Sequence, residues 1–142
     1  MDYFAESINE SPVLALKAGA ALTEVGGCAV GFDADGEAVL ASADTAAIGV
    51  ALLTNDESIP AGGDVQVQYK DIGLVKAGGA FNIGDKLAPD ANGALVKDTS
   101  GAYIAIALQA ASAPGALVQA IVERGTVAAA STGNVTPPKD NE

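Results

Sequence analysis

Apolar and polar positions alternate along short segments of the chain, and each segment ends at a turn signal. The alternation is clearest at Val65-Gln66-Val67-Gln68-Tyr69, where it has the period of two that is typical of a half-buried strand. Glycine and aspartate interrupt the segments about every 8–12 residues, a spacing typical of sandwiches and barrels. The pattern predicts strands at residues 29–32, 38–40, 48–53 and 65–69, and again at 86–88, 94–97, 103–108 and 117–123.

Two alanine-rich stretches, 41–53 and 104–113, have a composition that also suits helices. Gly49, Thr45 and Thr54 argue against a long helix in the first stretch, because glycine and threonine have low helix propensity. The sequence therefore predicts a mainly β protein with a compact barrel-like or sandwich body, extended N- and C-terminal arms, and room for one short helix.

Several short motifs occur twice in the same order. Lys-Ala-Gly at 17–19 recurs at 76–78, Asp-Ala-Asp-Gly at 33–36 recurs as Asp-Ala-Asn-Gly at 90–93, and the apolar stretch 48–52 recurs at 104–108. The offsets are 59 (76 − 17), 57 (90 − 33) and 56 (104 − 48), and aligning 63–67 with 115–119 gives 52 (115 − 63). We therefore expect a β body at 13–127 made of two pseudo-repeats, about 17–75 and 76–127, with an N-terminal arm at 1–12 and a flexible C-terminal tail at 128–142.

The composition excludes several function classes. The 142 residues carry a formal charge of −11, which repels nucleic-acid phosphates and anionic lipids, and no apolar run is long enough to span a membrane. The absence of histidine removes the commonest metal ligand and the commonest general base near neutral pH. Cys28 is the one cysteine, and we expect it to be a small buried apolar residue. Neither a nucleic-acid nor a membrane partner is expected.

The two Asp-Gly motifs invite comparison with a calcium loop. The glycine of an EF-hand loop stands at the sixth position, whereas Gly36 comes only three residues after Asp33, so the frame fails. Aspartate or asparagine followed by glycine is instead a strong hairpin signal. Asp33 with Asp35, and Asp56 with Glu57, could form carboxylate pairs, but both lie in sequence typical of exposed turns. We expect hairpins here, and no catalytic, metal-ligating or cofactor-binding residue and no cofactor.

Lipoyl and biotinyl carrier domains are one alternative, because they are also small β bodies of two quasi-symmetric halves. Their modified lysine lies on the hairpin between the halves, which would make Lys70 or Lys76 the candidate in this chain. Lys70 instead ends an alternating strand and Lys76 opens a repeat, so neither matches the expected tight turn. An adhesion or binding module is a further alternative.

The order of the repeated pieces across residues 17–125 resembles that of the decoration, or cement, proteins and head-fibre proteins of tailed bacteriophages. The pieces are Lys-Ala-Gly-Ala at 17–20, the Asp-Gly turns at 33–36 and 90–93, the Gly-Asp-Val-Gln-Val strand at 63–67, and the apolar segments at 104–111 and 117–122. This resemblance implies a non-enzymatic structural protein of the virion, assembled in the host cytoplasm. It further implies a homotrimer that binds the major capsid protein on the outer surface of the capsid and stabilises contacts between capsomers.

The N-terminal arm combines aromatic residues with an otherwise polar sequence. Tyr3 and Phe4 are two of the six aromatic residues, and Ile8 follows them. Aromatic side chains dominate binding hot spots, so we expect these three residues to contact the capsid or a neighbouring subunit. The alternatives are an ordinary disordered terminus or a strand that closes the chain's own body.

Overall fold

The computed structural model of the chain describes residues 11–42, 46–99 and 101–127, and these residues form strands and turns without a helix. Most of the strands belong to two five-stranded antiparallel sheets with the orders β1-β7-β5-β3-β4 and β10-β9-β11-β12-β8, while β2 and β6 pair separately. The strands are β1 (Val13–Lys17), β2 (Leu22–Thr23), β3 (Ala29–Phe32), β4 (Ala38–Leu40), β5 (Ala47–Ala51), β6 (Ser58–Ile59), β7 (Asp64–Gln68), β8 (Ile72–Lys76), β9 (Lys86–Pro89), β10 (Leu95–Lys97), β11 (Gly101–Ala107) and β12 (Leu117–Val127).

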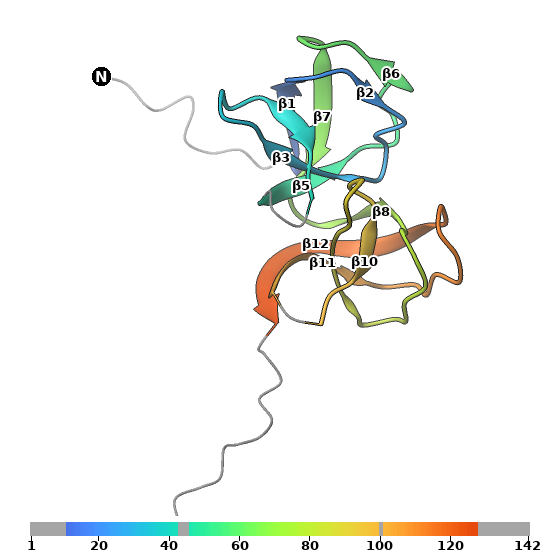
Figure 1. The fold of residues 1–142 in the computed structure, drawn as a ribbon. Coiled ribbons are helices and arrows are strands. Elements are labelled where there is room, and N and C mark those ends of the chain that lie inside the picture. Colours follow the sequence, from blue (N-terminus) through green and yellow to red (C-terminus); the bar gives the residue numbers. More distant parts are fainter. Residues whose placement is uncertain (1–10, 43–45, 100, 128–142) are drawn as a thin grey trace, which may run out of the picture.

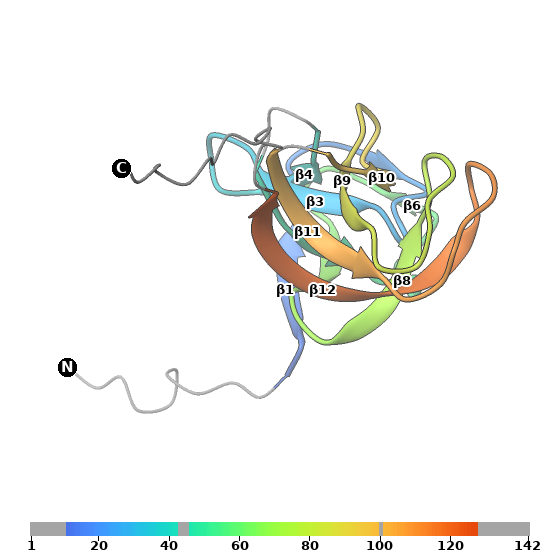
Figure 2. The same ribbon diagram turned by 90° about the horizontal axis from the view of Figure 1, so that it is seen from below.

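Each large sheet comes from one contiguous half of the chain. The first uses residues 13–68 and the second residues 72–127, and the two bodies stack on each other (Figure 1). The view from below shows the long strand β12 curving beside β11 and β8 (Figure 2). Neither sheet closes into a barrel, so the predicted mainly β body is confirmed as two stacked sheets.

The strand orders confirm the two pseudo-repeats, because β1, β7, β5, β3 and β4 occupy the same places as β8, β12, β11, β9 and β10. The turn hydrogen bonds repeat as well. Gly19 N donates to Ala38 O at 2.8 Å, as Gly78 N donates to Leu95 O at 2.7 Å. Because of this duplication, each residue of one half can be compared with the residue at the equivalent position of the other half.

The sequence alignment of the last strands was wrong by one residue. Leu52 N donates to Gln66 O at 3.0 Å, and Leu108 N donates to Gln119 O at 2.9 Å. Gln66 therefore corresponds to Gln119, an offset of 53 (119 − 66) and not 52. The loop that precedes β12 is one residue longer than the sequence alignment assumed, and apolar-for-polar exchanges in the strand hid the shift.

The predicted strands are all present with small changes at their ends, whereas β1, β8 and the two-residue strands β2 and β6 were missed. β1 and β8 each end at the lysine of the repeated Lys-Ala-Gly motif, which had been placed at the start of a repeat. The room left for a short helix was unnecessary, because the alanine-rich stretches form β5 and β11. Both strands lie inside a sheet, where the small side chain of alanine fits closely packed faces.

The Asp-Gly motifs form hairpin turns, as predicted. Asp33 Oδ1 accepts hydrogen bonds from the backbone N–H groups of Asp35 and Glu37, both at 2.9 Å. Asp90 Oδ1 does the same in the second half, from the N–H groups of residues 92 and 94 at 2.8 and 3.1 Å. The positive φ lies on the glycine alone, at 80° for Gly36, so the preceding residue needs no left-handed conformation.

The hydrophobic core consists of two clusters, one of which includes residues of both halves. One cluster lies within the first half and includes Val25, Val30, Val65 and Val67. The other cluster fills the second half, and three residues of the first half join it: Ala29, Ala41 and Val50. Shared packing of this kind couples the stability of the two halves.

Candidate interaction surface

The junction between the halves is held by backbone hydrogen bonds. Lys76 N donates to Gly27 O at 2.8 Å, and Ala29 N donates to Gly93 O at 2.7 Å. Both glycines have positive φ, at 83° and 85°. A Cβ atom at Gly27 would lie 2.9 Å from Lys76 N, so the close approach of the two backbones requires glycine there.

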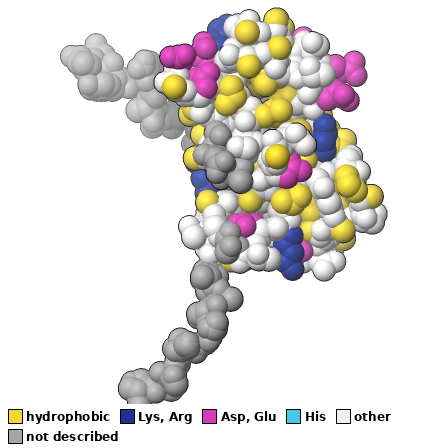
Figure 3. Space-filling view, in the orientation of Figure 1, with side chains coloured by type: hydrophobic (Ala, Val, Ile, Leu, Met, Phe, Trp, Pro, Cys, Tyr) yellow, Lys and Arg dark blue, Asp and Glu magenta, His cyan; other side chains and the backbone are white. Residues whose placement is uncertain are grey.

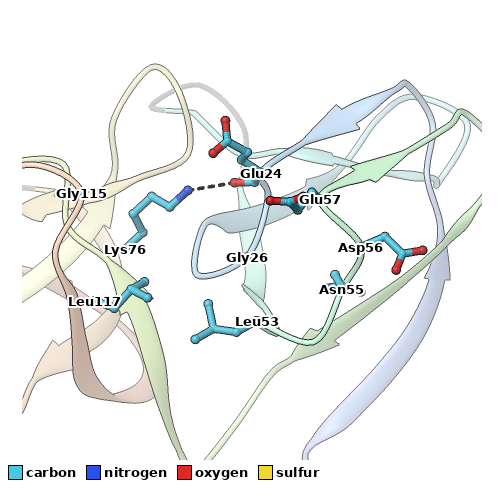
Figure 4. Close-up of a pocket in the computed structure, with 9 residues that line it drawn as sticks. All are labelled: Glu24, Gly26, Leu53, Asn55, Asp56, Glu57, Lys76, Gly115 and Leu117. Atoms are coloured by element: carbon cyan, nitrogen blue, oxygen red, sulfur yellow. Dashed lines mark hydrogen bonds between the residues drawn. The ribbon is translucent and has the colours of Figure 1, made fainter.

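An open groove of about 310 Å³ lies at this junction, and it is lined by residues of both halves. Lys76 Nζ donates a hydrogen bond to the backbone carbonyl of Glu24 at 2.8 Å across the groove (Figure 4). Leu117 lies on the same side as Lys76, Leu53 lies opposite, and the carboxylate of Asp56 points away from the lysine. The groove is wide and mixed in character, which suits contact with another protein more than enclosure of a small molecule.

An apolar face lies next to the groove on the outer side of strands β8 and β12. We define it by three exposed side chains: Ile72 is 59% exposed, Leu74 41% and Leu117 48%. The strand register pairs Leu117 with Lys76, Leu74 with Gln119, and Ile72 with Ile121, so all these side chains project from the same side of the sheet. Val75 and Val118 project from the other side and are buried.

The equivalent surface of the first half is polar. There, Lys17 pairs with Asp64, and Lys17 Nζ lies 2.6 Å from Asp64 Oδ1 in an exposed ion pair. Ala15 pairs with Gln66 at the place where the second half has Leu74 and Gln119. The fold therefore tolerates a polar surface at these positions, and the apolar face of the second half is not a requirement of folding.

Acidic side chains gather on the surface of the first body, as the space-filling view shows (Figure 3). Asp33 and Asp35 lie in the first hairpin turn, where the carboxylate of Asp33 is occupied by backbone N–H groups. Asp56 and Glu57 lie beside the junction groove. Within residues 11–42, 46–99 and 101–127, no three His, Cys, Asp or Glu side chains are grouped as a metal site would require.

Cys28 is buried in the core of the first half, as the sequence analysis expected. Burial raises the pKa of its thiol; Lys76 nearby lowers it and Asp90 raises it, both by smaller amounts than burial does. A buried thiol with a raised pKa is a poor nucleophile.

In the described part of the chain, no helix is long and apolar enough to cross a membrane.

Tyr3, Phe4 and Ile8 lie outside the described residues, so their predicted contacts stay a prediction. The apolar face was not predicted, although the sequence contains a signal for it. Ile72 and Leu74 are apolar residues two positions apart directly before the repeated Lys-Ala-Gly motif, where the first half has the smaller Val13 and Ala15. Comparing the repeats position by position finds this difference without a structure.

Comparisons with known proteins agree with the duplicated β fold. The family model described as phage cement protein matches residues 34–123. The crystal structure of the head fiber gp8.5 N base of bacteriophage phi29 is similar, with a TM-score of 0.57 and 22% sequence identity, and the match covers 78% of this chain and 92% of that one. At this identity the structural match shows a shared fold. No curated protein matches the chain.

The family match spans 90 residues (123 − 34 + 1) of the 142; it includes the whole second Asp-Gly hairpin and the part of the first that follows Asp33. A carrier domain is not favoured, because Lys76 turns its amine to a backbone carbonyl in the junction groove. The duplicated β body and the match to the family model agree with each other. The chain belongs to the phage cement protein family and is a structural protein associated with the bacteriophage capsid.

Proposed function

We propose that the chain assembles as a homotrimer on the outer surface of the capsid, binds the major capsid protein there and stabilises contacts between capsomers. It acts without catalysis, with residues 13–127 as its folded body. The observation that carries the proposal is the apolar face of β8 and β12, which has no counterpart in the first half.

Association is favoured by the place of this face in the sheet. β8 ends the strand order of the second sheet, so β12 is its one neighbouring strand in that sheet. Unpaired strand edges with apolar neighbours associate readily, and a closed ring of subunits removes both the free edge and the exposed apolar area. A small alanine-rich core also gains stability from a subunit interface.

The N-terminal arm is the second part of the proposal. Tyr3, Phe4 and Ile8 contact the capsid or a neighbouring subunit and anchor the arm there. Aromatic residues on a short acidic segment offer concentrated apolar area at a contact. This role is consistent with membership of the phage cement protein family.

The test is Leu74→Asp, with Ala15→Asp at the equivalent position of the first half as the matched control. Both variants place one carboxylate on the outer side of an edge strand. Burying a leucine contributes about 1.5–3 kcal/mol, so Leu74→Asp should weaken association about tenfold or more, whereas Ala15→Asp should have little effect.

Two measurements read the result. Light scattering after size exclusion gives the mass in solution, and co-sedimentation with undecorated heads gives capsid binding. A parent chain that is monomeric at all concentrations contradicts the homotrimer. A folded trimer that fails to bind heads contradicts the capsid role.

A further inference from the structure

We infer that residues 1–10 of a neighbouring copy cover the apolar face of β8 and pair with its outer edge at Leu74. This inference rests on the proposed homotrimer, and it specifies what forms the contact between subunits.

The backbone of β8 offers a pairing edge at Leu74. Ala77 N donates to Ala116 O, on the side of β12, whereas Lys76 N donates to Gly27 O, on the opposite side. Because amide directions alternate along a strand, the N–H and C=O groups of Leu74 point away from β12. Ile72 O on that edge already accepts a hydrogen bond from Gln68 Nε2 at 3.0 Å, so Leu74 lies between two occupied positions.

The side chains of the face and of the arm are complementary. Ile72 and Leu74 present apolar area, and a lysine lies near each end, Lys70 before the strand and Lys76 at its last residue. Residues 1–10 contain three acidic residues together with the apolar residues Met1, Tyr3, Phe4 and Ile8. An acidic segment with aromatic anchors fits an apolar strip bounded by cations.

The arm leaves the body close to the first residue of its own β8. Two hydrogen bonds from Tyr69 fix the residues that directly follow the arm: Tyr69 Oη donates to Ser11 O at 2.7 Å, and Tyr69 N donates to Pro12 O at 2.9 Å. Ile72, the first residue of β8, is only three positions after Tyr69. Ten extended residues span about 33 Å and the five of β8 about 17 Å, so the arm is longer than the strand that it covers.

A neighbouring copy is a better host for the arm than its own β8. An arm folded onto its own strand would cover the apolar face and remove the described surface that favours association. Three arms passed in one direction around a ring cover three faces and leave none exposed. The C-terminal residues 128–142 fit less well, because they contain no aromatic residue and follow Val127, which pairs with Gly101 beyond the part of β12 that contacts β8.

Disulfide trapping tests this arrangement. Phe4→Cys and Leu74→Cys chains with different tags are co-expressed and oxidised, and non-reducing electrophoresis detects the covalent pair. Each single variant expressed alone is the control, with Cys28 retained because it is buried. We expect a mixed covalent dimer at least tenfold more abundant than any dimer in the controls.

The alternative results are distinct. If a Phe4→Cys/Leu74→Cys double variant cross-links only within one chain, the arm lies on its own β8 and the inference is overturned. If no mixed dimer forms while the trimer mass persists, the arm does not dock on β8, but the proposed homotrimer survives. In addition, deleting residues 1–10 should speed hydrogen exchange at the Leu74 amide by at least tenfold, and an unchanged rate contradicts strand pairing.

Discussion

Gly78→Ala should destabilise the protein by disturbing the second Asp-Gly turn from outside the turn itself. A Cβ atom at Gly78 would lie 2.4 Å from Asp90 Oδ2 and 3.0 Å from a methyl carbon of Val96. Asp90 cannot simply rotate away, because its other carboxylate oxygen accepts hydrogen bonds from the N–H groups of Asn92 and Ala94. The neighbouring Gly79 is the matched control, since its Cβ would meet only Val96 at 4.0 Å.

The expected size follows from these contacts. Overpacking costs about 1–3 kcal/mol, and each lost turn hydrogen bond costs about 0.5–1.5 kcal/mol. The backbone can share the strain, so we expect Gly78→Ala to lower the free energy of unfolding by about 2 kcal/mol. Gly79→Ala should leave it unchanged or raise it by up to about 1 kcal/mol, because alanine restricts the unfolded chain.

Urea unfolding at one fixed protein concentration measures the difference. With a slope of about 2 kcal/mol per molar urea, the midpoint of Gly78→Ala should fall by about 1 M. In the Asp90→Ala background, the same Gly78→Ala change should cost much less, because the clashing carboxylate is gone. Equal midpoints for Gly78→Ala and Gly79→Ala, or full additivity with Asp90→Ala, would refute the reasoning.

Three further predictions concern the core, an exposed ion pair and the thiol. Leu95→Ala should cost about 2–5 kcal/mol in urea unfolding, whereas Ile83→Ala, at a residue 68% exposed, should cost less than about 0.5 kcal/mol; similar costs would contradict the described core. Lys17→Ala should lower stability by less than about 1 kcal/mol, because both side chains of the Lys17–Asp64 pair are largely exposed, and a larger loss would show that the pair is more shielded than described. Cys28 should react with a thiol reagent far more slowly in the folded than in the unfolded protein, and rapid labelling of the folded protein would contradict its burial. Burial raises the pKa of the folded thiol, so the contribution of Cys28 to stability should be lost as the pH rises from the ordinary thiol pKa through the folded one.

The sequence predicted what depends on neighbouring residues. The hairpins at Asp33 and Asp90 and the alternating strand β7 are local features, and their positions were correct. The difference between the repeats at Ile72 and Leu74 is visible in the sequence, but their exposure depends on which side of the β8–β12 pair faces the core, which is a non-local property. The contacts of Tyr3, Phe4 and Ile8 stay a prediction.

The division of the sheets between two contiguous halves has a consequence for biosynthesis. Once residue 68 has left the ribosome, every strand of the first sheet is available for pairing, and domains fold as they emerge. At that stage the amide of Ala29 lacks its acceptor, Gly93 O, and Ala41 and Val50 lack the second half of their cluster. The nascent first half is therefore an incomplete folding unit with an exposed apolar patch, and synthesis of the second half both completes the protein and removes this aggregation-prone surface.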